Sequence, residues 1–298
     1  SVARAMLAAL SCYRDADRLY ALQVEGLAAD LVVERWLGRE SLSSGFEWQV
    51  DALSTDAHLS LDDWLGKRAT LTTRGARGES IPRSGLVREA GCIGSDGGLA
   101  RYRLQLVPWT WLLGQGRHSR VFQDRSVIEI IEAVFADYAP LASWQLGDEV
   151  GPFLSEVRPR SYCVQYRETD FAFVSRLLAE EGLGWRLQET TDAPAGHTMA
   201  IFANSGDGPQ DASAEAGGGI RFHRADATES SDTVQALGTM QAIGSTALSL
   251  LSHDYKGAVI AMQMSLADAG DDAGALEVYD PSGAYAFTGQ DEAGRYAR

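Results

Sequence analysis

Apolar and polar side chains alternate in short runs over residues 18–107. Phe46, Trp48 and Val50, for example, are separated by polar residues. A period of two is typical of strands that bury one face. Residues 95–98 read Ser-Asp-Gly-Gly between two such runs, and an Asp-Gly pair favours the backbone angles of a tight hairpin. This region therefore predicts several short strands in a β-barrel or sandwich.

The pattern changes from strand to helix and back between Tyr162 and Leu187. Alternation predicts a first strand, and Thr169 and Asp170 then supply the oxygen acceptors that begin a helix. The helix carries apolar residues at steps of three and four, namely Phe171, Val174, Leu177 and Leu178. Gly182, followed by a leucine, predicts a left-handed glycine cap. The segment therefore predicts a strand, a capped helix and a second strand, and it contains no catalytic group.

A second helix is predicted after Ser126. Glu129 lies three residues later, which is the spacing of a capping box, and Pro140 stops the helix. The apolar stripe of this helix comprises Val127, Ile130, Ile131, Val134, Phe135 and Tyr138. Such a stripe usually faces a core, and a groove for a partner is the alternative.

The pattern weakens after Leu187. Residues 190–197 form a polar connection, and residues 199–202 and 257–264 predict short strands. Residues 204–219 are rich in Gly, Asp, Ala and Ser. We interpret them as a loop and not as a phosphate cradle, because no Lys-Ser/Thr pair follows the glycines.

Composition and charge exclude several classes of protein. The 298 residues are 45% hydrophobic and 22% charged, which is ordinary for a globular protein of one or two domains. The net charge of −15 repels nucleic-acid backbones and anionic lipid, and no run approaches the roughly 20 apolar residues that span a bilayer. Cys12, Cys92 and Cys163 form no close pair, which argues against a disulfide framework and suits a reducing compartment. Residues 1–17 are interpreted as an amphipathic lead-in and not as a signal peptide.

No catalytic or metal-binding arrangement emerges from the motifs. The string G-x-S-x-G is absent, and the candidate nucleophiles Ser205 and Ser245 lie in glycine-rich turns. The histidines are scattered without a metal-ligand spacing, at His58, His118, His197, His223 and His253. We expect each to be solvated or hydrogen-bonded. Asp268, Asp271 and Asp272 lack the order of a calcium loop. We therefore expect no catalytic residue, no metal and no cofactor.

The strand–helix–strand segment also carries a long motif. Its residues are Val164, Gln165, Tyr166, Arg167, Glu168, Asp170, Phe171, Arg176, Leu177, Glu181 and Gly182. This motif resembles the signature of VgrG proteins, the trimeric spikes of bacterial type VI secretion systems, in the region related to the central hub of contractile phage tails. Further similarity covers residues 84–87, residues 102–113 with their Pro-Trp-x-Trp segment, residues 119–126, and a strand with a Tyr-Asp turn at residues 276–283. The aromatic residues near 109–122 fit an interface or a core equally well.

The resemblance implies an α+β fold, mainly β, with two tube-type β-barrel domains and inserted helices. We expect the lead-in over residues 1–17 and the first barrel over residues 18–118. A helix-containing insertion with the signature is expected over residues 119–190, and a second barrel portion over residues 191–298. The barrels are expected to be discontinuous in sequence. The signature residues, Arg167 and Glu168 among them, are expected to act structurally.

The resemblance also implies a mechanical function. A homotrimer would join the Hcp tube ring to a puncturing needle, bind effector or adaptor proteins and the baseplate, and contact neither nucleic acid nor membrane stably. Two similar barrels in each of three subunits would match a six-fold tube. Such a protein assembles in the bacterial cytoplasm and is secreted without a signal peptide. Because no needle segment follows Arg298, we expect the resemblance to cover the head only. The alternatives are a secreted envelope-degrading hydrolase and the hub of a phage tail or tailocin.

Overall fold

The structure is a computed structural model. It describes residues 19–75, 79–96, 98–208, 234, 236–254, 259–266, 276–284, 287 and 290–296. The predicted lead-in, the glycine-rich end of the 204–219 loop, His223 and the acidic residues 268–272 lie outside the described residues. The chain divides into two compact units, of which the first holds residues up to 176 and 184–207. The second holds residues 177–183 and nearly all residues from 208 onward.

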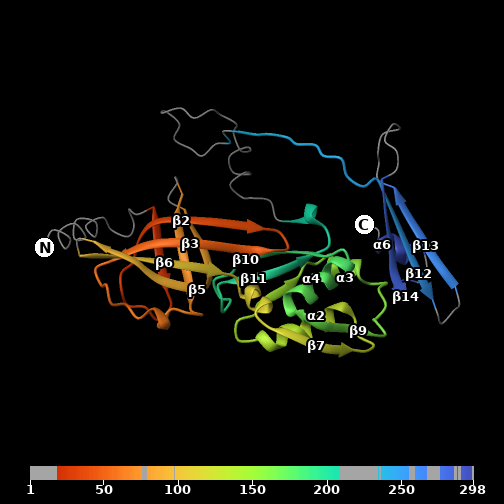
Figure 1. Ribbon diagram of the computed structural model, residues 1–298, viewed down its shortest axis with the longest axis horizontal. Coiled ribbons are helices and arrows are strands. Elements are labelled where there is room, and N and C mark those ends of the chain that lie inside the picture. The colour runs from red at the N-terminus through yellow and green to blue at the C-terminus, as the bar shows by residue number, and fades with distance from the viewer. Residues whose placement is uncertain are drawn as a thin grey trace. The chain divides into compact units, whose positions relative to one another are not determined.

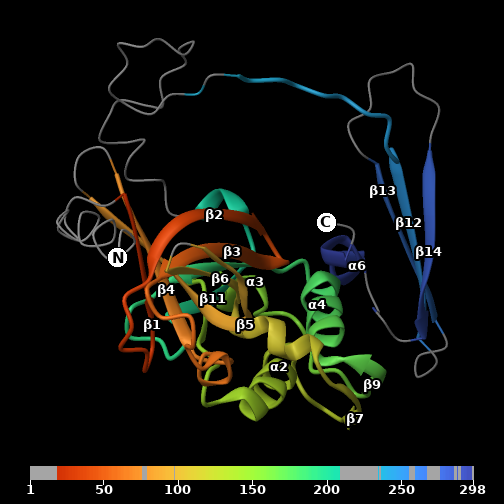
Figure 2. The same cartoon turned by 60° about the vertical axis from the view of Figure 1, so that its left-hand side comes forward.

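A curled six-stranded antiparallel sheet dominates the first unit (Figures 1 and 2). In spatial order its strands are β1 (Tyr20–Val24), β4 (Arg68–Arg74), β5 (Ser80–Asp96), β6 (Leu99–Val107), β3 (Gly45–Ser54) and β2 (Val32–Ser41). The long strand β5 pairs with β4 through its first half and with β6 through its second half, so the sheet bends along it. The two edge strands β1 and β2 come into contact, which brings the sheet close to a barrel.

The alternation read from the sequence accounts for the interior of this sheet. Phe46, Trp48 and Val50 are buried, as predicted. Fully buried neighbours from the other strands complete the core, namely Ala69, Leu71, Leu104 and Leu106. The hairpin predicted at residues 95–98 is confirmed, because Asp96 pairs with Leu99 across it and Gly98 has a φ of 88°.

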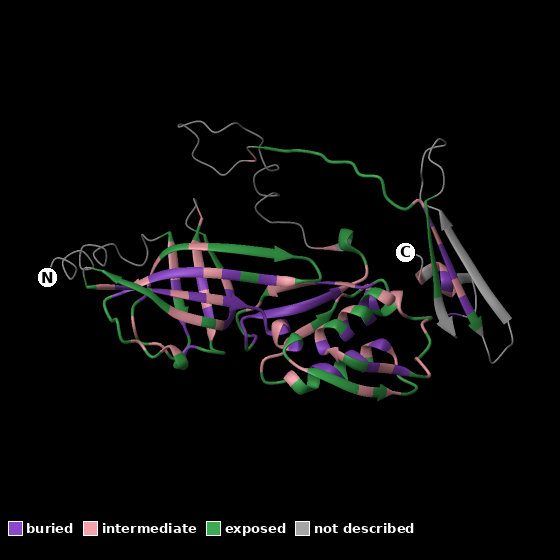
Figure 3. Ribbon diagram, in the orientation of Figure 1, coloured by how far each residue is buried: buried purple, intermediate pink, exposed green. Residues whose placement is uncertain are grey.

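Helices and shorter strands make up the rest of the first unit, which includes helix α4 only as far as Arg176. In chain order they include η3 (Trp109–Gly114), β7 (Arg117–Phe122), α2 (Val127–Phe135), η4 (Ala136–Tyr138), β8 (Trp144–Leu146), α3 (Val150–Phe153), β9 (Cys163–Thr169), α4 (Asp170–Glu180), β10 (Gly184–Glu189) and β11 (His197–Phe202). One small sheet has the order β10-β11-β8, and β7 pairs with β9 in a separate two-stranded ribbon. The predicted capping box is confirmed, since Ser126 and Glu129 exchange both hydrogen bonds. The five stripe residues on α2 are buried, so this is a core face, whereas Tyr138 lies beyond the end of α2, in η4, and is partly exposed (Figure 3).

The second unit contains a three-stranded sheet with one helix. Its strands β12 (Ala247–Asp254) and β13 (Val259–Leu266) are antiparallel, while β14 (Glu277–Ala284) runs parallel to β12. Leu250 of β12 packs with Phe287 and with Ala293 of helix α6 (Gln290–Tyr296). The expected Tyr-Asp turn is wrong: β14 continues through Asp280, and the pairing instead shifts register around residues 281–282. A proline has no amide hydrogen to donate, and a bulge tolerates that loss.

The described residues are mainly β with inserted helices, as the resemblance implies. The curled sheet agrees with a first barrel. Residues 191–298, where a second barrel portion was expected, contribute β11 to one three-stranded sheet and β12, β13 and β14 to another, and the predicted domain limits stay a prediction.

Candidate functional site

The signature residues lie around the junction between β9 and α4. Val164, Gln165, Tyr166, Arg167 and Glu168 are on the strand, Asp170, Phe171, Arg176 and Leu177 are on the helix, and Glu181 and Gly182 follow the helix. The structure brings Gln165 and Asp170 together in one polar network, and Glu168 and Arg176 in an ion pair. Tyr166 and Arg167 are exposed and belong to neither group.

A β-bulge shapes the strand just before the helix. The pairing of β7 with β9 matches Ser119 with Tyr166 and His118 with Glu168, which leaves Arg167 as the extra residue. Arg167 has a φ of 53°, in the left-handed region that side chains other than glycine rarely adopt. Its amide donates to Ser119 Oγ at 3.3 Å. The bulge shifts the strand by one residue and so directs Asp170 into the interior.

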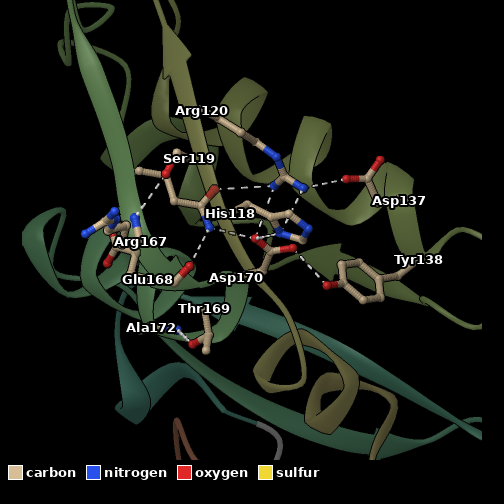
Figure 4. A network of polar contacts seen from close by, with 11 residues as sticks. His118, Ser119, Arg120, Asp137, Tyr138, Arg167, Glu168, Thr169, Asp170 and Ala172 are labelled. Atoms are coloured by element: carbon tan, nitrogen blue, oxygen red, sulfur yellow. Dashed lines mark hydrogen bonds and ion pairs between the residues drawn. The ribbon is translucent and has the colours of Figure 1, made fainter.

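Asp170 is the centre of a buried polar network, which Figure 4 shows. Its Oδ1 accepts hydrogen bonds from Gln165 Nε2 at 2.7 Å and from an Arg120 guanidinium nitrogen at 3.2 Å. His118 Nδ1 lies 3.0 Å from the same oxygen, and Tyr138 Oη donates to Oδ2 at 2.8 Å. These donors come from β9, β7 and η4, so one carboxylate ties three elements to the start of α4.

The electrostatics of this network favour an ionised Asp170. Burial alone would raise its pKa, but the hydrogen bonds from Gln165, His118 and Tyr138 and the charge of Arg120 outweigh burial and lower the pKa. Burial and the hydrogen bond to Asp170 raise the pKa of Tyr138. A carboxylate that stays ionised and a phenol that stays protonated exchange no proton near neutral pH. The network therefore suits structural support better than acid–base chemistry.

The helix α4 is secured at both ends. Thr169 Oγ1 accepts a hydrogen bond from the amide of Ala172 at 3.1 Å, which confirms the predicted N-terminal cap. At the other end Gly182 has a φ of 72°, and its amide donates to the Ala179 carbonyl at 3.0 Å. The amide of Leu183 donates to the Leu178 carbonyl at 2.8 Å. This pair of bonds is a Schellman motif and confirms the predicted glycine cap.

Ion pairing and ring contacts attach the first turns of the helix to the strands. Arg176 donates to Glu168 Oε1 at 2.6 Å and to the carbonyl of Val164 at 3.2 Å. Phe171 contacts the ring of Trp185 edge-on, with centroids 6.2 Å apart. Leu177 and Glu181 are buried. The signature residues thus lie on the strand, at the bulge and on the helix, and their structural role stays a prediction.

A second buried junction, which the sequence did not indicate, joins the β10–β11 hairpin to the curled sheet. His197 is 1% exposed and begins β11, although it was expected in a polar connection. Its Nε2 accepts a hydrogen bond from the amide of Trp109 at 3.1 Å, and its Nδ1 donates to the carbonyl of Ser84 at 3.0 Å. Burial lowers the pKa of His197 to about 4. Both ring nitrogens are occupied by backbone groups, so this histidine is neutral and structural.

Ser84 and Glu189 strengthen the same junction. The carboxylate of Glu189 accepts hydrogen bonds from the amide and the hydroxyl of Ser84. Gly196 has a φ of 81°, and a Cβ there would lie 2.2 Å from Ser84 Cβ. The side of this junction opens into a pocket of about 390 Å³ that Phe46 and Trp48 help to line. Residues 84–87 resemble the family pattern in the sequence. The close approach of Gly196 to Ser84 is the physical reason for a small side chain at position 84.

No metal site is formed by the residues that the structure describes: no three His, Cys, Asp or Glu side chains converge. Within the same residues no helix is long and apolar enough to cross a membrane. Ser205 begins the short helix η5 (Ser205–Asp207), and Ser245 precedes β12. The structure brings neither of them to a histidine by any hydrogen bond between described residues.

Comparison with protein families decides the classification. The model of the phage tail baseplate hub family (GPD) matches residues 39–298. The chain belongs to this family.

Curated relatives of this hub protein come from secretion systems. It is 36% identical over 153 residues to the type VI secretion system spike protein VgrG1b of Pseudomonas aeruginosa, which covers 51% of this chain and 20% of that protein. It is 33% identical over 200 residues to the spike protein VgrG3 of Vibrio cholerae, covering 63% of this chain and 18% of the relative. The resemblance to VgrG proteins is confirmed. The hub protein spans about a fifth of the length of these relatives.

Solved structures support the same fold. The Escherichia coli c3393 protein is a component of the type VI secretion system that resembles the T4 tail proteins gp27 and gp5. It aligns with a TM-score of 0.54 at 23% identity, over 63% of this chain and 50% of that one. A prophage MuSo2 tail protein from Shewanella oneidensis aligns with a TM-score of 0.55 at 12% identity, over 93% of this chain and 76% of that one. The hub protein therefore shares the fold of phage and secretion-system tail proteins.

Proposed function

We propose that this hub protein is the head of a type VI secretion spike. The observation that carries the proposal is the hub family match over residues 39–298, together with VgrG spike relatives at 32–36% identity. In this role the chain forms a homotrimer that joins the Hcp tube ring to a puncturing needle. A subunit with two similar barrels gives a trimer six similar docking surfaces, which suits a six-fold tube.

The function of this segment is mechanical and not enzymatic. The polar groups at the β9–α4 junction bind one another. Asp170 has four hydrogen-bonding partners, and Glu168 forms an ion pair with Arg176. A fully satisfied network of this kind rigidifies the elements that it joins. Rigidity suits a part that transmits force during contraction. One relative is named an actin cross-linking toxin, but this chain matches only 15% of it.

The partners follow from the same role. Effector or adaptor proteins and the baseplate bind the assembled spike, and the segment engages neither nucleic acid nor membrane stably. The protein assembles in the bacterial cytoplasm and leaves with the tube. The net charge of −15 supports the exclusion of nucleic acid, because like charges repel.

The test is assembly of the purified chain with Hcp rings from the same bacterium. Light scattering over a range of concentrations should give the mass of a trimer, and electron microscopy should show a three-fold ring on the end of a six-fold one. A chain that stays monomeric and does not cap the rings would refute the proposal. Capping of a phage tube from the same genome, and not of Hcp, would assign the chain to a phage tail or tailocin. Hydrolysis of cell-wall material that one substitution abolishes would revive the enzyme alternative.

A further inference from the structure

The outward face of the β7–β9 ribbon exposes an apolar, aromatic surface. Val121 of β7 is 56% exposed, Tyr166 of β9 is 68% exposed, and Tyr162, which immediately precedes β9, is 61% exposed. Most of β7 is exposed, as Figure 3 shows. The opposite face of the ribbon carries the buried Cys163 and Gln165. Alternation thus places the two tyrosines on the solvent side, where their rings are not buried in the core.

Arg167 lies beside this face, and its backbone adopts a strained conformation. A φ of 53° is unfavourable for arginine, whereas glycine would form the same bulge without strain. What arginine adds is its guanidinium, whose central carbon lies 5.6 Å from the centre of the Tyr166 ring. Figure 4 shows the Arg167 side chain directed away from Asp170. Strain that the fold does not need is a marker of function.

The charge of the ribbon is opposite to that of the chain. Strands β7 and β9 contain three arginines, Arg117, Arg120 and Arg167, and one acidic residue, Glu168. Arg120 and Glu168 are held in the ion pairs described above. Arg117 and Arg167 form no ion pair with another residue in the described part of the chain. In a protein with a net charge of −15, this face is a local basic and aromatic patch.

We propose that this outward face, formed by Arg117, Val121, Tyr162, Tyr166 and Arg167, is a docking surface for a protein partner that presents carboxylates around an apolar centre. Tyrosine and arginine dominate the energetic centres of protein interfaces, and complementary charge orients the partner. A nucleic acid fits less well, because the remainder of the chain repels a phosphate backbone. The surface adds a further protein partner to the hub role, and the proposal does not depend on the trimer or the tube.

A random dodecapeptide library displayed on yeast provides the probe. Peptides are selected on the wild-type chain and counter-selected on the Tyr166→Ser variant. We expect enriched peptides to be acidic with at least one large apolar residue. Fluorescence anisotropy should show that Arg117→Glu, which plays no part in the selection, weakens binding by about tenfold or more. Salt should weaken binding further, because it screens exposed charges. The matched control is Leu37→Ser with Arg39→Glu on the exposed strand β2, which should leave the affinity unchanged.

The variant Arg167→Gly separates docking from folding. It keeps the bulge and removes the strain, so its melting temperature should equal or exceed that of the wild type while peptide binding weakens. Enrichment of neutral or basic peptides, or equal binding by the variants, would overturn the proposal. Binding of labelled oligo-dT that is lost in Arg117→Glu would assign the face to nucleic acid instead. A fall in the native mass of the chain in Tyr166→Ser would assign it to a second copy.

Discussion

Replacing Asp170 by asparagine removes the charge that organises the β9–α4 junction. The side chain keeps its shape and loses its negative charge. Arg120 then keeps only the exposed Asp137 as a charged partner, and the amide nitrogen of asparagine cannot accept a hydrogen bond as the carboxylate oxygen that it replaces did. Truncating one side of a buried charged network leaves the other side uncompensated, which is the costly case.

The magnitude follows from burial. Because the Asp170 side chain is fully buried, we expect a loss of about 3 kcal/mol in the free energy of unfolding, at the lower end for breaking a buried pair. Solvent reaches Arg120, whose side chain is 23% exposed, and that exposure keeps the loss from being larger. For a cooperative unit of this size, the melting temperature should fall by about 6–12 °C.

The same network supplies a matched control. Asp137 binds Arg120 at 2.7 Å, but its side chain is 61% exposed. Asp137→Asn should cost only about 0–1 kcal/mol, because water screens exposed ion pairs. Both variants are compared with the wild type by urea unfolding followed by circular dichroism. If Asp170→Asn cost no more than Asp137→Asn, the carboxylate would not support the junction and the structural interpretation of the signature would be wrong.

Three further predictions concern stability. Gly182→Ala should cost about 1–2 kcal/mol in thermal unfolding, because φ is 72° there, whereas Gly151→Ala, in open space, should not destabilise. A hydrogen bond from Arg103 lowers the pKa of Asp51 to about 2, so the stability that Asp51 contributes is complete above about pH 4 and is lost as the pH falls toward 2. The free energy of unfolding of Asp51→Asn, measured in urea, should not fall with pH in this way. If it fell as steeply as that of the wild type, the role given to Asp51 would be wrong. Because His197 has a pKa of about 4, the free energy of unfolding should decrease as the pH falls from about 6.5 to 4. If a His197→Gln variant showed the same decrease, His197 would not be its cause.

The local elements could be predicted because their signals are local. Ser126 and Glu129 are three residues apart, and the helix cap at Gly182 needs only the residues of one turn. Period-two alternation gave the buried faces of β3 and β6 for the same reason. Strand β2 was missed, because it is an edge strand that is exposed along most of its length and carries no such alternation.

The sequence by itself determined the class of the protein, the capped helices and the family to which the signature belongs. Only the tertiary structure decided which polar groups meet. Asp170 and His118 are 52 positions apart, and His197 is 113 positions from Ser84. No periodicity links residues so distant, since their contact depends on how the sheets and helices pack. The bulge at Arg167 is also tertiary in origin, because it arises from the register of β9 against β7.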